Sequence, residues 1–279
     1  MKSSKLLPQD IARLVEGGEG EAWAEMFLSA PADVVADFGL RVERVGSAIA
    51  LITKKMDLML FNRVIGLGVV EPATEAMVDA IVTLYQNAGI QNFAVQLSPT
   101  AQPSALPAWL EARSLPRRDN WAKVYRGVEA PPEVPTNLRI ECIGSEHAAA
   151  FASVACSAFG MPDTLRPWLA TPVGGPGWRH YLAWDGDLPV ATGALYVRDQ
   201  VGWLGVGSTL PSHRRQGAQG AILAQRIRDG IELGCRWLIT ETDEDTHDHP
   251  NPSYHNIRRT GFKLAYQRPN YIFQTSPVS

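Results

Sequence analysis

The stretch STLPSHRRQGAQGAILAQRI, residues 208–227, sets the architecture of the second half of the chain. It starts at the end of a β-favouring run, meets Pro211, and passes through two arginines into glycines and small residues. Apolar residues then recur at helical spacing, which predicts a helix that begins around Gly217 to Gly220. A helix start leaves backbone N–H groups without internal partners and carries partial positive charge. The segment therefore predicts a strand–loop–helix unit whose loop can bind an anion.

The composition of this loop also favours an anion site. Four of its residues have no bulky side chain and let an anion approach the backbone: Gly217, Ala218, Gly220 and Ala221. Arg214 and Arg215 add positive charge at the rim. Hydrogen bonds to a charged group contribute about 1.5–3 kcal/mol each, so a few donors could hold a diphosphate. No Lys-Ser/Thr pair follows the glycines and no GxGxxG is present, which argues against two familiar nucleotide loops. An ordinary turn with solvated arginines is the alternative.

The bulk composition describes a globular protein. The chain has 279 residues, 45% hydrophobic and 20% charged, with a net charge of −3. This charge predicts no nucleic-acid partner and no anionic membrane partner. Three cysteines without paired spacing argue against a disulfide framework and against a zinc site, so no metal is expected. No signal peptide is read in residues 1–21 and no transmembrane run elsewhere, so we expect a cytoplasmic protein, either monomeric or homodimeric.

The order of elements occurs twice along the chain. The proline-rich stretch 128–137 reads as a linker between residues 1–127 and 138–279. Gly89 and Gly234, 145 positions apart, each end a helix before a buried strand. Each half reads as hairpin strands followed by β-α-β-α-β, which predicts an α/β fold with a mixed sheet and helices on both faces. An internal duplication explains this order, although two α/β units can also arise independently.

The loop resembles the signature of the GNAT superfamily of acyl-CoA-dependent N-acyltransferases, V-x-P-x-x-R/Q-x-x-G-x-G/A. Pro211, Arg214 and Gly217 stand at the matching intervals, whereas Thr209 replaces the usual Val and Gln219 the usual Gly or Ala. The segment NPSYHNIRRTGF, residues 251–262, resembles a second family motif that ends in Gly-Phe. The resemblance covers residues 138–275 and extends to 1–127 only in the order of elements. It predicts two GNAT-like domains in tandem.

This resemblance implies that acetyl-CoA is the cosubstrate and that residues 138–279 bind it. In the family, a central strand and the next strand splay apart, and the coenzyme arm lies in the gap. Carried over by position, the coenzyme-binding residues would be Ser208, Thr209, Leu210, Arg214, Arg215, Gln216, Gly217, Ala218, Gln219, Gly220, Ala221, Asn251, Ser253 and Asn256. The first half has no such loop and carries Glu71 and Glu75 there, so we expect it to be degenerate.

The reaction that the resemblance implies requires an amine to lose a proton. An alkylamine has a pKa of about 10.4, so freeing its lone pair at neutral pH costs roughly 4–5 kcal/mol. Glu241, which follows a predicted strand, is the best candidate base, ahead of Asp243 and Asp199. The family often has a tyrosine general acid where this chain has Ile257. Tyr254 is the nearest substitute, Tyr266 is another, and water could also protonate the leaving thiolate.

Three functions are compatible with these residues. The first is acetyl transfer to a primary amine of a small molecule or peptide. The second is a non-catalytic acyl-CoA-binding sensor or interaction module, which the missing tyrosine and Gln219 favour. The third is an aminoacyl-tRNA-dependent transferase, which would need a basic groove that the net charge disfavours.

Overall fold

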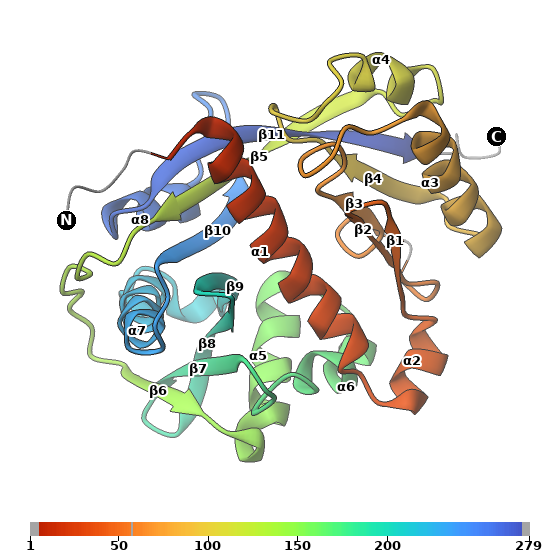
Figure 1. Cartoon of the computed structure of the whole chain (residues 1–279). Coiled ribbons are helices and arrows are strands. Elements are labelled where there is room, and N and C mark those ends of the chain that lie inside the picture. Colours follow the sequence, from red (N-terminus) through yellow and green to blue (C-terminus); the bar gives the residue numbers. More distant parts are fainter. Residues whose placement is uncertain (1–5, 57, 275–279) are drawn as a thin grey trace. The chain divides into compact units, whose positions relative to one another are not determined.

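The polypeptide forms two compact units in the computed structural model, which describes residues 6–56 and 58–274. Unit 1 comprises Met1–Lys123 and Leu264–Ser279, and unit 2 comprises Val124–Lys263. The outer ends of the two predicted domains, and the start of the segment read for a signal peptide, lie outside the described residues. Figure 1 gives the course of the chain and the element labels.

Unit 1 has helices around a mixed sheet. Its helices are α1 (Pro8–Leu28), α2 (Ala32–Phe38), α3 (Glu75–Ala88) and α4 (Leu106–Glu111). Its strands are β1 (Arg41–Val45), β2 (Ala48–Ile52), β3 (Arg63–Ile65), β4 (Asn92–Gln96), most of β5 (Arg117–Arg126) and nearly all of β11 (Lys263–Gln274). They follow the order β1-β2-β3-β4-β11-β5, with β3 and β4 parallel. Val78, Ile81 and Tyr85, one turn apart on α3, are fully buried against this sheet.

Unit 2 also has helices around a mixed sheet. Its strands are β6 (Arg139–Ile143), β7 (Trp178–Asp185), β8 (Leu188–Arg198), β9 (Val201–Thr209) and β10 (Trp237–Asp243). Its helices are α5 (Ala148–Phe159), α6 (Arg166–Ala170), α7 (Ala218–Glu232) and α8 (Pro252–Arg259), with short 3-10 turns η1 (Ser145–His147), η2 (Asp163–Leu165) and η3 (Pro211–His213). The strand order is β10-β9-β8-β7-β6, and only the β9–β10 pair is parallel.

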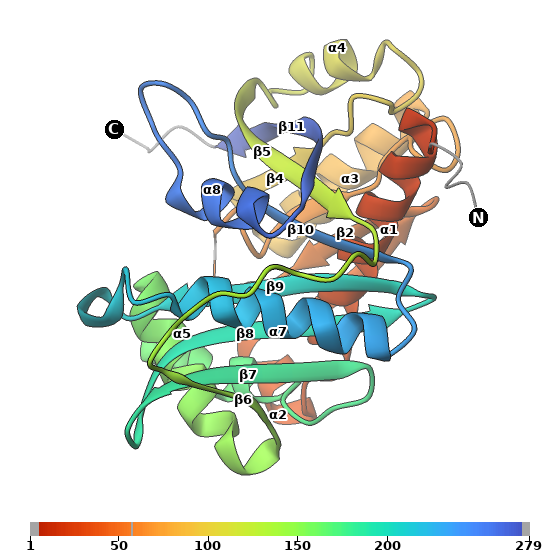
Figure 2. The ribbon, with the colours of Figure 1, turned by 90° about the vertical axis from the view of Figure 1, so that its left-hand side faces the viewer.

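Helices α5 and α7 cover opposite faces of the unit 2 sheet (Figure 2). Adjacent residues of a strand point to opposite faces, and β7 shows this directly. His180 contacts Phe151 of α5 with ring centroids 4.8 Å apart, whereas Tyr181 donates to Asp229 of α7 at 2.6 Å. Ile222, Leu223 and Ile227 of α7 join the core on that second face. The predicted layering, with helices on both faces of a mixed sheet, is confirmed.

The C-terminal strand belongs to unit 1, not to the unit that precedes it in sequence. Strand β11 pairs antiparallel with β4, with Asn270 opposite Gln96 and Tyr271 opposite Val95. Arg268 of β11 is fully buried and donates to Glu16 at 2.9 Å and to Glu19 at 2.7 Å, both on α1. The compact units therefore differ from the expected ranges 1–127 and 138–279 at the last strand. Residues 128–137, predicted to link the two domains, contain no helix or strand and lie within unit 2.

Candidate functional site

Strands β9 and β10 separate at the carboxyl end of their parallel pair. Within the described chain, their pairing ends at Trp203 and Ile239, although β9 continues to Thr209 and β10 to Asp243. The hydroxyl of Thr240 donates to the carbonyl oxygen of Leu204 at 2.6 Å, just beyond the last backbone pair. The gap that the GNAT resemblance implies is present between these strands.

A β-bulge changes the direction of β9 at the start of the gap. Val206 has a φ of +51°, and the register between β8 and β9 shifts between Thr192 and Ala194. Arg226 of α7 donates to the carbonyl oxygens of Gly205 at 3.0 Å and Ala194 at 3.1 Å, so it stabilises the bulge from the α7 face. Burial lowers the pKa of Arg226 to about 10.

Thr209 is the residue at the end of β9 whose backbone faces the gap. The N–H of Leu210 donates to the carbonyl oxygen of Val190 on β8 at 2.9 Å. The backbone N–H and C=O groups of successive strand residues point alternately to the strands on either side. Ser208, two residues before Leu210, therefore also faces β8, and Thr209 faces the side of β10. Ser208 is buried, and its hydroxyl lies 2.7 Å from that of Thr192. Of the three strand residues predicted to bind the coenzyme, Thr209 has the orientation for it.

The loop after β9 ends in a helix start with free donors. Gly217 is the N-cap of α7 with a φ of +82°, and Ala221 donates the first helical bond, to Gly217 at 3.0 Å. The backbone N–H groups of Ala218, Gln219 and Gly220 precede this bond. None of them donates a hydrogen bond to an acceptor within residues 6–56 and 58–274. Arg214 and Arg215 are exposed beside them. The structure thus brings together the donors and the cations predicted from this loop.

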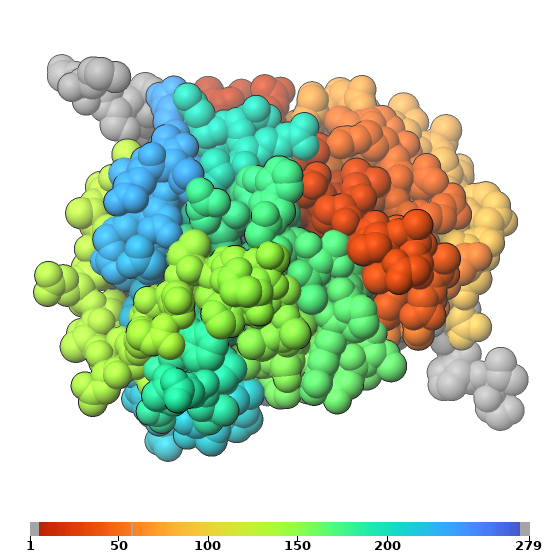
Figure 3. All heavy atoms as spheres, turned by 90° about the horizontal axis from the view of Figure 1, so that it is seen from below, coloured from red at the N-terminus to blue at the C-terminus, as the bar shows by residue number. Residues whose placement is uncertain are grey.

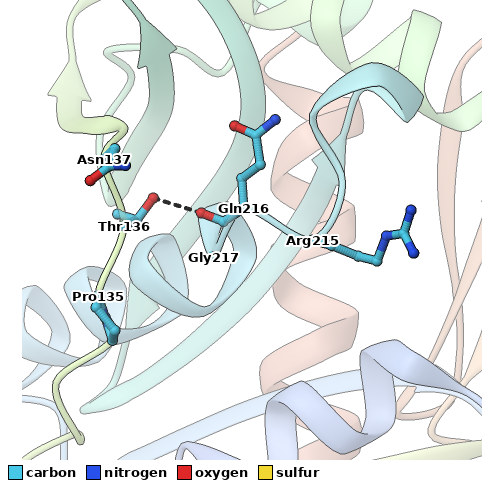
Figure 4. A pocket seen from close by; sticks show the side chains of 6 residues that line it. All are labelled: Pro135, Thr136, Asn137, Arg215, Gln216 and Gly217. Carbon is cyan, nitrogen blue, oxygen red and sulfur yellow. Dashed lines mark hydrogen bonds between the residues drawn. The ribbon is translucent and has the colours of Figure 1, made fainter.

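The linker packs against this loop from the side opposite to Arg215. The hydroxyl of Thr136 donates to the carbonyl oxygen of Gln216 at 2.8 Å, and Arg215 extends away from that contact (Figure 4). An open pocket of about 600 Å³ lies between the two segments, lined by Pro135, Thr136, Asn137, Arg215, Gln216 and Gly217. A Cβ on Gly217 would lie 2.7 Å from the carbonyl oxygen of Pro135. Much of the linker is exposed at the surface of unit 2 (Figure 3).

The side chain of Gln219 ties the helix start to the strand end. Its Nε2 atom lies 2.6 Å from the carbonyl oxygen of Ser208, 3.2 Å from that of Thr192 and 3.1 Å from the hydroxyl of Thr209. Gln219 replaces the small residue of the family signature, and its side chain has an internal role here. Its backbone N–H is still one of the free donors.

Glu241 lies on the part of β10 that has left the pair with β9. Its two carboxylate oxygens are 3.0 and 3.2 Å from the indole Nε1 of Trp203 on β9. Trp203 is buried and Glu241 is half-buried. The candidate base therefore stands beside the gap with a fixed hydrogen-bond donor. Asp199 lies in the turn before β9, at the opposite end of that strand from the gap.

The second motif forms helix α8. Asn251 is its N-cap: Oδ1 accepts from the N–H groups of Ser253 at 2.9 Å and Tyr254 at 3.2 Å, and Nδ2 donates to the Asp243 carbonyl at 2.7 Å. Ser253 is exposed, and Asn256 accepts a hydrogen bond from Arg259 at 3.1 Å. Asn251 thus fixes the start of α8 to the end of β10.

The candidate general acids differ in their environments. Tyr254 is half-buried, packs beside the core of unit 2 and lies under the guanidinium of Arg258. Ile257, at the position of the family's tyrosine, is buried. Tyr266 belongs to unit 1, where its hydroxyl donates to Glu16 at 2.7 Å. Burial raises the pKa of Tyr266 well above its usual value.

Among the described residues of unit 1, strands β3 and β4 form no gap like the one between β9 and β10. Beyond the parallel pair of β3 and β4, Gln102 donates its N–H to Gly68 and accepts from Ala73, each at 2.8 Å. A Cβ on Gly68 would lie 2.5 Å from the Gln102 carbonyl oxygen. Glu71, predicted to oppose anion binding, accepts the N–H of Ser47 at 2.8 Å. The loops that follow these two strands are bonded to each other.

The described residues lack two other kinds of feature. None of their helices combines the length and the apolar character needed to cross a bilayer. Their His, Cys, Asp and Glu side chains form no group of three or more suited to a metal ion.

Solved structures identify the fold. A GCN5-related N-acetyltransferase from Kribbella flavida superposes with a TM-score of 0.67 at 18% identity, over 99% of this chain and 98% of that chain. A GCN5-related N-acetyltransferase from Sphaerobacter thermophilus superposes with a TM-score of 0.59 at 16% sequence identity, over 97% of this chain and 95% of that chain. A tandem GNAT protein from the clavulanic acid biosynthesis pathway superposes with a TM-score of 0.58 at 15% sequence identity, over 97% of this chain and 98% of that chain. No protein-family model and no curated protein matches the sequence. The chain has the tandem GNAT fold, which confirms the predicted fold class.

Proposed function

We propose that the protein is an acetyl-CoA-dependent N-acetyltransferase whose unit 2 binds the coenzyme. The observation that carries the proposal is the combination, in one unit, of a gap between β9 and β10 with three free N–H donors at the start of α7. The donors of Ala218, Gln219 and Gly220, with Arg214 and Arg215, suit the diphosphate. The backbone of Thr209 suits the amide-bearing arm. The names of the similar structures support the same activity.

Bound acetyl-CoA would supply a thioester as acyl donor. The acceptor nitrogen forms a bond to the acetyl carbon, the carbon–sulfur bond breaks, and its electron pair leaves with the sulfur. Glu241 takes the proton from the amine, directly or through water. The thiolate takes a proton from water or from Tyr254. Backbone N–H groups of the splayed β9 segment can stabilise the oxyanion of the tetrahedral intermediate.

The acceptor that we propose is a primary amine of a small molecule or peptide. Unit 1 would complete the fold without binding coenzyme A, because Gly68 and Gln102 close the corresponding gap. A second candidate, the acyl-CoA sensor, is favoured by one observation: the position of the family's general acid is the buried Ile257.

Thiol release over a panel of primary amines tests the proposal. We expect acetyl-CoA turnover with at least one amine, and a loss of turnover in Glu241→Gln with coenzyme binding retained. Tight coenzyme binding without turnover on any amine would identify the sensor. Failure to bind acetyl-CoA would contradict both candidates.

A further inference from the structure

The indole ring of Trp203 lies over the backbone of Gly205. The two residues are two positions apart on β9, so their side-chain directions share one face of the sheet. A Cβ on Gly205 would lie 1.8 Å from Cη2 and 2.3 Å from Cζ3 of the Trp203 ring. Any side chain at position 205 would therefore displace the ring. Glycine at this position lets the indole fold along the strand towards the gap.

The ring is held in this orientation by its neighbours. Trp203 is 2% exposed, and its ring meets that of Trp178 edge to face with centroids 6.2 Å apart. Tyr196 packs on Trp178 at 4.8 Å. Close packing leaves the indole little freedom, so its N–H is fixed in direction.

That N–H is directed at Glu241. Both carboxylate oxygens lie within 3.2 Å of Nε1, so this donor contacts both oxygens of the carboxylate. A donor to a carboxylate also favours its charged form, which is the form that accepts a proton. Trp203 lies on the strand that forms one side of the gap, and Glu241 lies on the strand that forms the other.

We propose that Trp203 is a positioning residue that orients the carboxylate of Glu241 to take the proton of the acceptor amine. The inference rests on the proposed function, because Glu241 acts as a base only if the protein transfers an acyl group. Gly205 is part of the same arrangement, since it provides the space for the ring.

Three variants separate this role from general packing. Trp203→Phe keeps an aromatic ring and removes the N–H. Gly205→Ala keeps the indole and displaces it. Trp184→Phe is the matched control, because the Trp184 indole is buried at the other end of β7 from Trp178 and, among the described residues, its N–H has no hydrogen-bond partner.

We expect Trp203→Phe and Gly205→Ala each to lower kcat about tenfold, the loss that corresponds to one hydrogen bond to a charged group. The KM for acetyl-CoA should stay near the wild-type value. Trp184→Phe should retain the wild-type kcat. Equal kcat values in Trp203→Phe and Trp184→Phe would overturn the inference.

A second measurement does not depend on turnover. In a 1H–15N spectrum of the full chain, the indole N–H signal of Trp203 should move in Glu241→Gln and Gly205→Ala, while that of Trp184 stays in place. An unmoved Trp203 signal would overturn the inference even if the protein is an active acetyltransferase. A moved signal in a protein that turns over no amine would leave the arrangement intact and contradict only the proposed function.

Discussion

The side-chain amide of Gln219, on the first turn of α7, lies 2.6 Å from the carbonyl oxygen of Ser208 at the end of β9. This contact fixes the helix start, with its three free N–H groups, relative to the strand that lines the gap. A diphosphate and the arm attached to it must meet both elements at once. The proposed coenzyme site therefore depends on the position of α7 relative to β9.

Replacing Gln219 by alanine removes three hydrogen bonds and loosens this link. We expect the dissociation constant for coenzyme A to rise about tenfold, because the donors lose their alignment with Thr209. Isothermal titration measures the effect. The control is Gln225→Ala on the same helix, where the amide donates to Asp229 at 2.6 Å and accepts from Arg228 at 3.0 Å. Equal affinities in the two variants would show that Gln219 does not set the site.

Gly217→Ala should damage the loop in two ways. A left-handed φ of +82° costs a non-glycine residue about 1–2 kcal/mol. The new Cβ would also press on Pro135 at 2.7 Å, and overpacking of this kind costs about 1–3 kcal/mol. Gly234→Ala is the control, because Gly234 has a φ of +84° and open space around it. Urea unfolding should show the larger loss for Gly217→Ala, and only that variant should bind coenzyme A more weakly. If both variants lost the same unfolding free energy and the same affinity for coenzyme A, the contact between Gly217 and the linker would have no role.

Thr136→Val tests whether the linker supports the loop. The change keeps the side-chain shape and removes the hydroxyl that donates to Gln216 at 2.8 Å. We expect a loss of about 0.5–1.5 kcal/mol in unfolding free energy and a several-fold weaker affinity for coenzyme A. Thr171→Val removes a comparable bond, to Pro167 at 3.1 Å, away from the loop and should leave affinity unchanged. Unchanged affinity in Thr136→Val would mean that the linker does not position the loop.

His180 should make the protein sensitive to acid. Burial lowers its pKa from 6.5 to about 3, so the folded state keeps it neutral where the unfolded chain binds a proton. Stability is therefore full above pH 6.5 and falls as the pH drops towards 3, by up to about 1.4 kcal/mol per pH unit. His180→Phe, which removes this titration, should flatten the pH dependence of urea unfolding in that window. An identical slope in wild type and variant would contradict this assignment.

The loop and its helix could be predicted from the sequence because local residues determine them. Pro211 ends the strand, and Gly217 supplies the left-handed turn that begins α7. The roles of Trp203 and Arg226 were missed, because each depends on a rotamer and on a partner in another element. Trp203 did carry a signal, since a glycine two residues further along β9 leaves room for its ring.

The local sequence also does not predict which of the two units contains the last strand, β11. The pattern around Tyr271 and Phe273 predicts a strand but does not say which strand it joins. That choice depends on long-range pairing with β4 and on the burial of Arg268 against α1. The assignment of coenzyme contacts to Asn251, Ser253 and Asn256 stays a prediction.

The central claim is that the N–H groups of Ala218, Gln219 and Gly220 bind the diphosphate of coenzyme A. Backbone amide spectra recorded with coenzyme A and with pantetheine, which lacks the diphosphate, test it most directly. We predict that coenzyme A shifts these three signals and that pantetheine leaves them in place. Saturating coenzyme A without a change in these signals would contradict the account.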